Sequence, residues 1–593
     1  MIPSISDVWR ENPEVQFILA DSPTLGVARK RLFGYLAAQE EGLLNHNYDV
    51  HPLEWSTTLD SLRVLRRVFS VRNEEVSGFS ALNLLYNAAR GITRDEDLQP
   101  GFKQEFRHLL RAAAGRARLH AEIEPTAPRQ LKGREAALAR SEALDRLAEY
   151  AAGWLERYPT GLAPAVVRRR AANRERIRAV LGATEEQWDD YRWQLRHVIR
   201  NARALARLVR LTNEEAAAIE AARAGGVPFG VTPHYVSLMD YNASRTFDHS
   251  VRAQVIPSPH YVHRLRDCRA RGEHSLDFML EGDTSPVDLV TRRYPRIAIL
   301  KPYNTCAQIC VYCQRNWEIA EPLAPGAAAD KPRLDAAMDW FRAHPAVTEV
   351  LVTGGDPLVP GTGFIERVLE QLAAIDHIER IRIGSRVFVT VPQRITRRLA
   401  DTIARFHEPG RREVVIVTHI QHVYEVTGET VRAVQEFRQR GIAVYNQMVY
   451  TREVSRRFEA AALRRLLRLA GVDPYYTFNT KGKEETSDFR VPIARLLQEQ
   501  KEEARQMSGM VRTDEAVFNL PGLGKNYVRA AQHHDVIMIL ADGRRVYEFH
   551  PWEKRISLAS TYIETDVGIW EYLEWLKERG EKRRDYRSIW YYY

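Results

Sequence analysis

The chain has 593 residues, too many for one ordinary domain, and 45% of them are hydrophobic, enough to build a sizeable core. Its net charge of +9 is a mild basic excess that suits anionic ligands without requiring nucleic acid. Only 4 cysteines are present, which excludes a disulfide scaffold and indicates a reducing compartment such as the cytoplasm. We expect no membrane span and no signal peptide, since no apolar run is long enough and the first residues lack the required basic and apolar regions.

The first part of the chain, residues 1–184, is rich in Ala, Leu, Arg and Glu and carries apolar residues at helical spacing, for example Leu62, Leu65 and Val68. We therefore expect a helical region, whose role the sequence does not disclose. Its arginine run 168–170 could form a nucleic-acid surface. Such runs are more often the solvated face of a helix, and we predict a solvated helix face here.

Three of the four cysteines, Cys306, Cys310 and Cys313, lie within eight residues behind the apolar run 297–300. Thiolates at this spacing can converge on a small inorganic centre and leave its fourth metal corner open. A structural zinc ion is the alternative, with Cys268 or a histidine as fourth ligand. Structural zinc sites usually pair their cysteines in two C-x2-C-like knuckles, so the single cluster of three disfavours zinc.

Between residue 297 and about residue 480, short β-branched runs alternate with longer amphipathic stretches, which predicts repeated βα units around a parallel sheet. Six such units make a partial barrel. In βα barrels the chemistry lies at the carboxyl ends of the strands, because those loops converge on one mouth. The strands that we expect are 297–301, 348–353, 380–385, 413–418, 442–449 and 475–479.

Polar residues follow these strands. The second strand ends in Gly354-Gly355-Asp356, where paired glycines let the backbone approach a ligand and the acid can hold an ammonium group. Taken alone, this tripeptide is usually just a turn, and strand-end polar residues often cap helices. The third, fourth and fifth strands end in or carry the polar residues Ser385, His419 and Gln447.

A lysine ends a glycine-containing loop late in this region, in the phrase Asn519-Leu-Pro-Gly-Leu-Gly-Lys525. By itself such a lysine is usually a solvated turn or a phosphate contact. Upstream, Arg293 and Tyr294 precede the first strand, and Arg315 follows the cysteine cluster. An arginine fork suits bidentate pairing with a carboxylate.

Together with these motifs, the C-x3-C-x2-C spacing of Cys306, Cys310 and Cys313 resembles the signature of the radical S-adenosylmethionine (SAM) enzymes. The phrases Trp188-Asp-Asp-Tyr-Arg-Trp-Gln-Leu-Arg196 and Val231-Thr-Pro-His-Tyr-Val-Ser-Leu-Met239 are similar to elements that open the catalytic region of the lysine 2,3-aminomutase family. The resemblance covers about 370 residues and fades after roughly residue 555.

The resemblance implies a [4Fe-4S] cluster held by the three cysteines, with SAM on its free iron. Lys525 matches the family's lysine that holds pyridoxal 5'-phosphate (PLP), Arg293 and Tyr294 match residues at the PLP phosphate, and Arg315 matches the residue that pairs with the substrate's α-carboxylate. The implied fold is α/β, a radical SAM partial (β/α)6 barrel with a helical N-terminal region and a short C-terminal extension. Matches to the family's SAM contacts are Gly354, Gly355, Asp356, Ser385, His419 and Gln447.

The substrate prediction rests on two positions. Lysine-specific members of the family place two aspartates around the substrate's distal ammonium, and Lys481 and Asn519 stand at the matching places here. Two unit charges about 4 Å apart at an effective dielectric near 20 interact by about 4 kcal/mol, so this exchange should disfavour lysine. Lys481 through its charge and Asn519 through its amide suit a side-chain carboxylate. The resemblance is closest to glutamate 2,3-aminomutase, and we predict conversion of L-glutamate to β-glutamate.

Four segments are expected. They are a helical N-terminal region (1–184), a helical lead-in (185–285), the partial barrel with its PLP loop (286–530), and a C-terminal hairpin and extension (531–593). The last eight residues, Tyr586 to Tyr593, are mostly aromatic, and we expect them to dock on a neighbouring subunit or to fray.

The implied partners are an amino-acid substrate, an electron donor such as flavodoxin or ferredoxin, and further copies of the chain in a cytoplasmic homo-oligomer. No nucleic-acid or membrane partner is expected. Lysine or another amino acid is the alternative substrate, and another radical SAM reaction is a further alternative. From a different functional class, the chain could be an iron–sulfur or zinc protein that binds RNA through its basic amino-terminal part.

Overall fold

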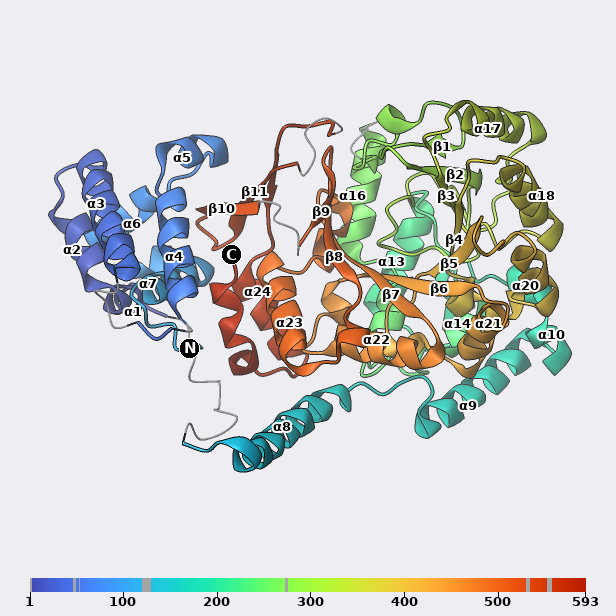
Figure 1. Ribbon diagram of the computed structural model, residues 1–593, viewed down its shortest axis with the longest axis horizontal. Coiled ribbons are helices and arrows are strands. Elements are labelled where there is room, and N and C mark those ends of the chain that lie inside the picture. The colour runs from blue at the N-terminus through green and yellow to red at the C-terminus, as the bar shows by residue number, and fades with distance from the viewer. Residues whose placement is uncertain are drawn as a thin grey trace.

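The computed structural model describes residues 3–45, 50–52, 54–119, 130–271, 276–528, 534–551 and 557–593. Its first part is helical, and α1 to α7 form one group at the left of Figure 1 while α8 and α9 lead across to the central sheet. These helices are α1 (Ile5–Glu11), α2 (Pro13–Asp21), α3 (Leu25–Leu44), α4 (Trp55–Val68), α5 (Val71–Ser77), α6 (Ala81–Ala89), α7 (Pro100–Ala113), α8 (Gly133–Leu155) and α9 (Pro164–Leu181).

Short helices continue the chain up to the sheet. A capping box opens the helix that follows Thr212: the Thr212 hydroxyl accepts the Glu215 amide at 3.0 Å, and the Glu215 carboxylate accepts the Thr212 amide at 2.9 Å. The helices of this lead-in are α10 (Glu185–Asp189), α11 (Tyr191–Arg196), α12 (Ala202–Ala206), α13 (Asn213–Ala224), α14 (Pro233–Ser237), α15 (His249–Ala253) and α16 (Pro259–Ala270).

Among the described residues, the central sheet contains nine strands in chain order; β2 to β8 are parallel, and β1 and β9 are its antiparallel edges. All six predicted strands are present within two residues of their expected ends, and β8 adds a seventh parallel strand. The predicted α/β class with a parallel sheet is therefore confirmed. The strands are β1 (Val290–Thr291), β2 (Ile297–Tyr303), β3 (Glu349–Gly354), β4 (Arg380–Ser385), β5 (Glu413–Thr418), β6 (Ala443–Val449), β7 (Asp473–Thr480), β8 (Glu515–Leu520) and β9 (Gly524–Tyr527).

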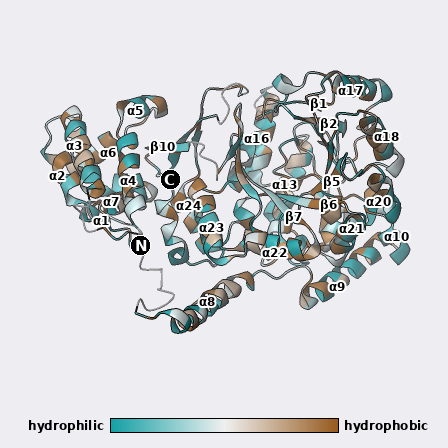
Figure 2. Cartoon of the chain, viewed as in Figure 1, coloured by the Kyte–Doolittle hydropathy of each residue, from teal (hydrophilic) through white to brown (hydrophobic). Residues whose placement is uncertain are grey.

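Amphipathic helices connect the parallel strands. In α18 the residues Ile365, Val368, Leu369 and Leu372 recur at helical spacing and are fully buried, which seats one face of the helix on the core. Figure 2 shows apolar and polar residues alternating along these helices. The connecting helices are α17 (Lys331–Ala343), α18 (Thr362–Ala373), α19 (Val387–Thr390), α20 (Arg397–Ala404), α21 (Gly428–Arg438), α22 (Glu459–Ala470) and α23 (Ile493–Gln506).

The C-terminal part returns to the first helices. Strands β10 (His534–Ile539), β11 (Arg545–Phe549) and β12 (Tyr562–Thr565) form an antiparallel sheet, and the predicted hairpin at Asp542-Gly543 is confirmed. The buried ion pair between Arg545 and Glu105 of α7, at 2.9 Å, joins this sheet to the first helices. Helix α24 (Ile569–Glu578) follows.

The expectation for the aromatic C-terminus is wrong. Tyr586 is fully buried, and the Tyr593 hydroxyl lies 3.0 Å from the hydroxyl of Ser61 in α4. Tyr591 likewise lies 3.0 Å from a ring nitrogen of His108 in α7. These aromatic rings therefore bury apolar surface between the two ends of the same chain, a contact that no local pattern could reveal.

The prediction for the arginine run 168–170 is correct only for Arg168, which is exposed. Arg170 is buried over the ring of Tyr424, 4.4 Å from its centroid, and Arg169 pairs with Asp240 at 3.1 Å. The run therefore fastens α9 to the loop after β5 instead of facing solvent or nucleic acid.

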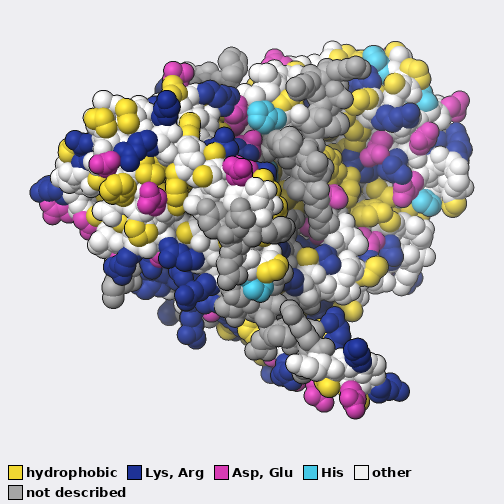
Figure 3. All heavy atoms as spheres, turned by 60° about the vertical axis from the view of Figure 1, so that its left-hand side comes forward, with side chains coloured by type: hydrophobic (Ala, Val, Ile, Leu, Met, Phe, Trp, Pro, Cys, Tyr) yellow, Lys and Arg dark blue, Asp and Glu magenta, His cyan; other side chains and the backbone are white. Residues whose placement is uncertain are grey.

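Basic side chains on the face drawn in Figure 3 form several patches interrupted by acidic and apolar ones, with no single continuous stripe. Among the described helices, none has both the length and the apolar character needed to cross a bilayer.

Candidate active site at the carboxyl edge of the sheet

The cysteine loop follows β2 and is held by the lead-in helices. The amide of Ile309 donates to the Gly230 carbonyl at 3.0 Å, and the amide of Val311 donates to the Gln254 carbonyl at 2.9 Å. Burial raises the pKa of Cys306 and of Cys313, and neighbouring negative groups raise both further. Protonated thiols in such a place become metal ligands when a cation stabilises their thiolates.

The spacing of the thiols bears on the kind of centre. Among the described residues, the three cysteine sulfurs do not all lie within 4.8 Å of one another. Ligands about 2.3 Å from one tetrahedral zinc would lie roughly 3.8 Å apart. The three sulfurs therefore do not form a ready tetrahedral zinc site. Cys268, in α16, packs in an apolar cluster with Val311 and Tyr312.

The Gly354-Gly355-Asp356 turn after β3 lies directly against the cysteine loop. The Gly355 amide donates to the Tyr303 carbonyl at 2.8 Å. A Cβ atom at Gly355 would lie 2.0 Å from the carbonyl oxygen of Thr305, so any side chain there would collide with backbone. Gly354 has φ +114, which side chains rarely tolerate. The two glycines therefore bring Asp356 beside the cysteines.

Asp356 is buried, and its carboxylate is fixed from β4. The Ser385 hydroxyl donates to Oδ1 at 2.8 Å, and the backbone amide of Arg386 donates to Oδ2 at 2.7 Å. Burial raises the pKa of Asp356, although these hydrogen bonds oppose the rise. The structure thus brings together Gly354, Gly355, Asp356 and Ser385, as the sequence prediction requires.

Arg386 is a residue of this site that the sequence analysis did not single out. Its Nη1 donates to the sulfur of Cys310 at 2.6 Å, and its Nη2 donates to Glu425 at 2.7 Å and to Gln254. Burial works against the charged guanidinium, but Cys310, Tyr235 and Glu425 outweigh it and raise the pKa of Arg386. Its position directly after Ser385 was the signal available in the sequence.

His419 and Gln447 lie next to each other after β5 and in β6. Burial lowers the pKa of His419 to about 4, although a hydrogen bond from its ring to the Gln447 backbone opposes the shift. The His419 carbonyl accepts Arg386 Nε at 3.1 Å. The ring is therefore neutral near pH 7 and adjoins the network around the cysteine loop.

Lys525 does not end a free loop but lies on β9, which forms a hairpin with β8 and places Lys525 opposite Asn519. Its amide donates to the Tyr294 hydroxyl at 3.2 Å, and its ammonium lies 4.1 Å from the Tyr476 ring centroid. Burial, and secondarily Arg382, lower the pKa of Lys525 to about 7. A large share of this amine is therefore uncharged near neutral pH, as a nucleophilic lysine needs.

Arg293 and Arg315 meet at one carboxylate, Glu281, which the sequence analysis also missed. Arg315 lies 2.7 Å, Arg293 3.2 Å and Lys301 3.4 Å from its oxygens. Burial opposes ionisation of Glu281, but the three cations outweigh it and lower its pKa. Nitrogens of both guanidinium groups are buried without a properly oriented hydrogen-bond acceptor among the described residues. Such donors fit a phosphate and a carboxylate.

Lys481 and Asn519 are neighbours at the ends of β7 and β8, where the Lys481 amide donates to the Asn519 carbonyl at 3.3 Å. The Lys481 ammonium is fully buried and donates to Asp566 Oδ1 at 2.6 Å. The Asn519 side chain donates to Gln314 at 3.3 Å. Lys481 therefore has a carboxylate partner from the C-terminal segment, which the sequence did not suggest.

Several known proteins are similar in sequence to this chain. No protein-family model matches the chain. An uncharacterized KamA family protein from Methanocaldococcus jannaschii is 41% identical over 99% of this chain and 97% of its own length. Glutamate 2,3-aminomutase from Clostridioides difficile is 31% identical over 54% of this chain and 72% of its own length. L-lysine 2,3-aminomutase from Bacillus subtilis is 31% identical over 53% of this chain and 63% of its own length. Glutamate-specific and lysine-specific relatives are thus equally similar.

Proposed function

Because this chain belongs to the KamA family, we propose that it is a 2,3-aminomutase, which moves the α-amino group of an amino acid to the neighbouring carbon. The aminomutases among its relatives are radical SAM enzymes that use a [4Fe-4S] cluster, SAM and PLP. One observation supports the proposal. The same edge of the sheet holds three cysteines, an aspartate that follows two glycines, and a lysine whose pKa is about 7.

The proposed cluster ligands are Cys306, Cys310 and Cys313, half-buried free cysteines whose C-x3-C-x2-C spacing suits a metal cluster. For SAM we propose the Gly354-Gly355 backbone together with Asp356, whose buried carboxylate suits an ammonium group. The further proposed SAM contacts are Ser385, His419 and Gln447. The strand order supports a partial (β/α)6 barrel around these residues.

When bound, the cluster and SAM supply a radical that removes an unactivated hydrogen, and PLP carries the migrating amino group. Lys525 contributes a partly uncharged amine that can hold PLP. Arg293 supplies its guanidinium for the PLP phosphate, with Nε buried without a hydrogen-bond partner among the described residues, and Tyr294 lies beside Lys525. Arg315 supplies a fork for the α-carboxylate of the substrate. Glu281 holds both arginines in place between turnovers.

For the substrate we propose L-glutamate, converted to β-glutamate. Lys481 has three N–H donors, of which Asp566 accepts one, so the others are available to a side-chain carboxylate. Lysine is the alternative, because the Asp566 carboxylate lies at the same place and would attract an ammonium group. An electron donor such as flavodoxin or ferredoxin, and a homo-oligomeric state, complete the proposal.

The test is to incubate the reduced, reconstituted enzyme with SAM, PLP and each amino acid in turn. We expect β-glutamate from glutamate and little β-lysine from lysine. Asp566→Asn removes the carboxylate that neutralises the buried Lys481 ammonium, so glutamate, whose side-chain carboxylate can replace that charge, should keep more turnover than lysine in a variant that melting curves show to be folded. β-Lysine from lysine, with glutamate untouched, would refute the substrate, and loss of lysine turnover in Asp566→Asn would then identify its ammonium partner.

A further inference from the structure

A cavity of about 540 Å³ lies where five separate parts of the chain meet, and none of the proposed cofactor or substrate residues lines it. It is bounded by the linker after α8, the segment before α15, the loops after β5 and β6, and the end of α24. Its lining residues are Arg157, Tyr158, Pro159, Ser244, Arg245, Thr246, Phe247, His249, His422, Arg452, Glu453, Arg456, Trp575, Glu578 and Arg579.

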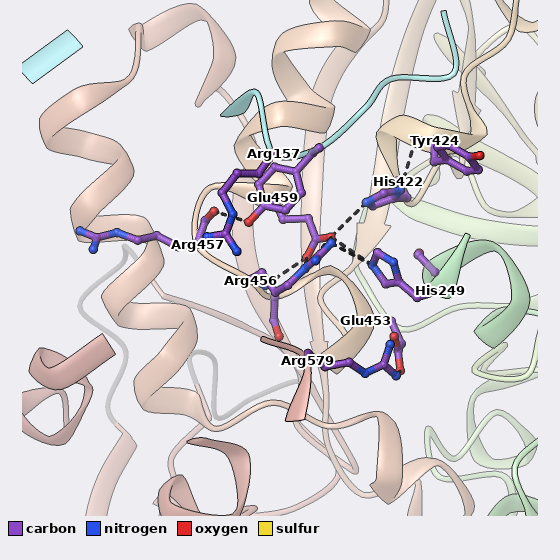
Figure 4. A network of polar contacts seen from close by, with 12 residues as sticks. Arg157, His249, His422, Tyr424, Glu453, Arg456, Arg457, Glu459 and Arg579 are labelled. Atoms are coloured by element: carbon purple, nitrogen blue, oxygen red, sulfur yellow. Dashed lines mark hydrogen bonds and ion pairs between the residues drawn. The ribbon is translucent and has the colours of Figure 1, made fainter. Parts of the chain in front are cut away.

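Next to this cavity is a buried carboxylate, Glu459, at the start of α22. Figure 4 shows the side chains of His249, His422 and Arg456 pointing toward it. Oε1 lies 3.2 Å from His249 Nε2, 3.1 Å from His422 Nε2 and 2.6 Å from Arg456 Nη2. Burial opposes ionisation of Glu459, but Arg456 and the histidine hydrogen bonds outweigh it and lower its pKa. The negative charge of Glu459 is thus already compensated by Arg456 and by the histidine hydrogen bonds.

The two histidines and Glu459 lie close enough together to suggest a metal site, yet their hydrogen bonding argues against one. The Tyr424 amide donates to His422 Nδ1 at 3.2 Å, so the neutral ring carries its proton on Nε2. Nε2 then has no lone pair to offer a metal. Arg456 also lies at the same place, with its Nη2 3.2 Å from His249 Nε2. A cation would meet a proton and a guanidinium there.

The opposite wall is built on Trp575. Arg452 and Arg579 both lie over its indole, 5.4 and 5.3 Å from the ring centroid. Arg579 pairs with Glu453 at 3.0 Å. Within the described part of the chain, Arg452 Nε and Glu453 Oε2 are buried without a hydrogen-bond partner. The wall therefore presents one unsatisfied donor and one unsatisfied acceptor, which are costly unless a ligand or water meets them.

We propose that this cavity binds a phosphate ester with free hydroxyl groups, of about the size of a nucleotide. Five arginines against two glutamates line the space, and arginine forks match phosphate oxygens. Four of these arginines already have carboxylate partners, which fixes their orientation, while Arg452 forms no ion pair with a described residue and acts on Asp488 only at longer range. A hydroxyl on the ester gives Glu453 the donor that it lacks. The volume is far larger than inorganic phosphate needs.

Isothermal titration of the full-length protein, loaded with its cluster, SAM and PLP, tests this proposal, because those cofactors then occupy the other nucleotide and phosphate sites. The protein as purified is titrated in parallel. The probes are adenosine 5'-monophosphate, ribose 5-phosphate and inorganic phosphate. We expect at least one ester to bind more tightly than inorganic phosphate and to raise the melting temperature. The tighter ester shows whether a nucleoside or a sugar phosphate is preferred.

Arg452→Gln should weaken ester binding by tenfold or more. The matched control is Arg411→Gln, which removes an exposed arginine on the loop before β5 and should change nothing. Arg579→Lys keeps the charge and should weaken binding less than Arg452→Gln.

Melting curves without ligand identify any variant that fails to fold, and in that case Arg579→Gln replaces it. Failure of both esters to bind overturns the proposal, as does equal binding by wild type, Arg452→Gln and Arg579→Gln. Zinc binding that depends on His249, without ester binding, would establish the metal site instead.

Discussion

Two halves of the sheet's carboxyl edge differ in how their buried polar groups are satisfied. Beside the cysteine loop, Asp356, Arg386 and Glu425 bond to one another or to neighbouring backbone and side chains. Around Glu281, Arg293 and Arg315 share one carboxylate, and Arg293 Nε and Arg315 Nη1 are buried without a hydrogen-bond partner among the described residues. A satisfied network keeps one geometry without a ligand, whereas unpaired buried donors gain most when an anion binds. The first half therefore keeps its geometry without a ligand, whereas the second gains its missing hydrogen-bond partners when its ligands bind.

Removing a cysteine has the largest expected effect on the first half. Cys310→Ala should reduce iron content and SAM cleavage to background, because no other cysteine of the sequence stands in the C-x3-C-x2-C spacing. Cys268→Ala is the matched control and should keep both. Iron analysis and product chromatography check this. Equal losses in the two variants would show that the site contains four cysteines.

Replacing Arg386 tests the hydrogen-bond network beside the cysteine loop. Arg386→Gln leaves Glu425 buried without its cation, which should cost about 3 to 5 kcal/mol of unfolding free energy. Loss of the positive charge at Cys310 should also lower the reduction potential of the cluster. Urea unfolding and a redox titration followed by electron paramagnetic resonance measure the two effects.

The control for Arg386 lies on the same strand. Arg380, at the other end of β4, forms exposed pairs with Glu349 and Glu413, so Arg380→Gln should cost less than about 1 kcal/mol and leave the potential unchanged. A folded Arg386→Gln variant with an unaltered potential would contradict the role assigned to the guanidinium.

In the second half, Glu281→Gln removes the carboxylate that compensates two arginines and Lys301. The ligand-free protein should lose about 2 to 4 kcal/mol of stability, and PLP should restore part of the loss because its phosphate replaces the missing charge. Glu318→Gln is the control, since its oxygens lie 3.6 Å from Arg315 and Lys301, and it should cost less. Urea unfolding with and without PLP measures both. A loss in Glu281→Gln that PLP does not reduce would argue against an anion site here.

The smallest expected effect is a pH dependence at Lys525. With a pKa of about 7, the uncharged fraction of this amine rises about tenfold per pH unit below pH 7 and levels off above it. The rate of PLP attachment, trapped by borohydride and located by peptide mapping, should follow the same curve. An ordinary lysine would continue to gain reactivity up to about pH 10. The group also makes the ligand-free protein more stable as pH rises above 7, because the unfolded chain then binds more protons.

Labelling of Lys481 or Lys483 in that experiment, with Lys525 unlabelled, would overturn the assignment of the PLP lysine. Lys525→Arg is the matched control, since it retains a long basic side chain but has no amine that PLP and borohydride can label.

The sequence by itself determined the features that depend on local order. β-Branched runs of four to eight residues predicted the parallel strands, because their side chains fit a sheet buried on both faces. The spacing of Cys306, Cys310 and Cys313, and of Gly354 and Gly355, was sufficient to predict one sheet edge with a metal centre, since loops after parallel strands meet there. The family resemblance added the cofactors and the identity of Lys525.

Only the tertiary structure decided how charges are paired. Asp566 neutralises Lys481 from 85 residues away, and Glu281 gathers Arg293, which precedes β2, and Lys301, which lies within it. Arg170 buries itself on Tyr424, although its sequence neighbours suggested solvent. The aromatic C-terminus packs on α4 and α7 of the same chain. Such partners are chosen by which surfaces the folded chain brings together, and a charged or aromatic residue carries no sequence mark of the residue that it will meet.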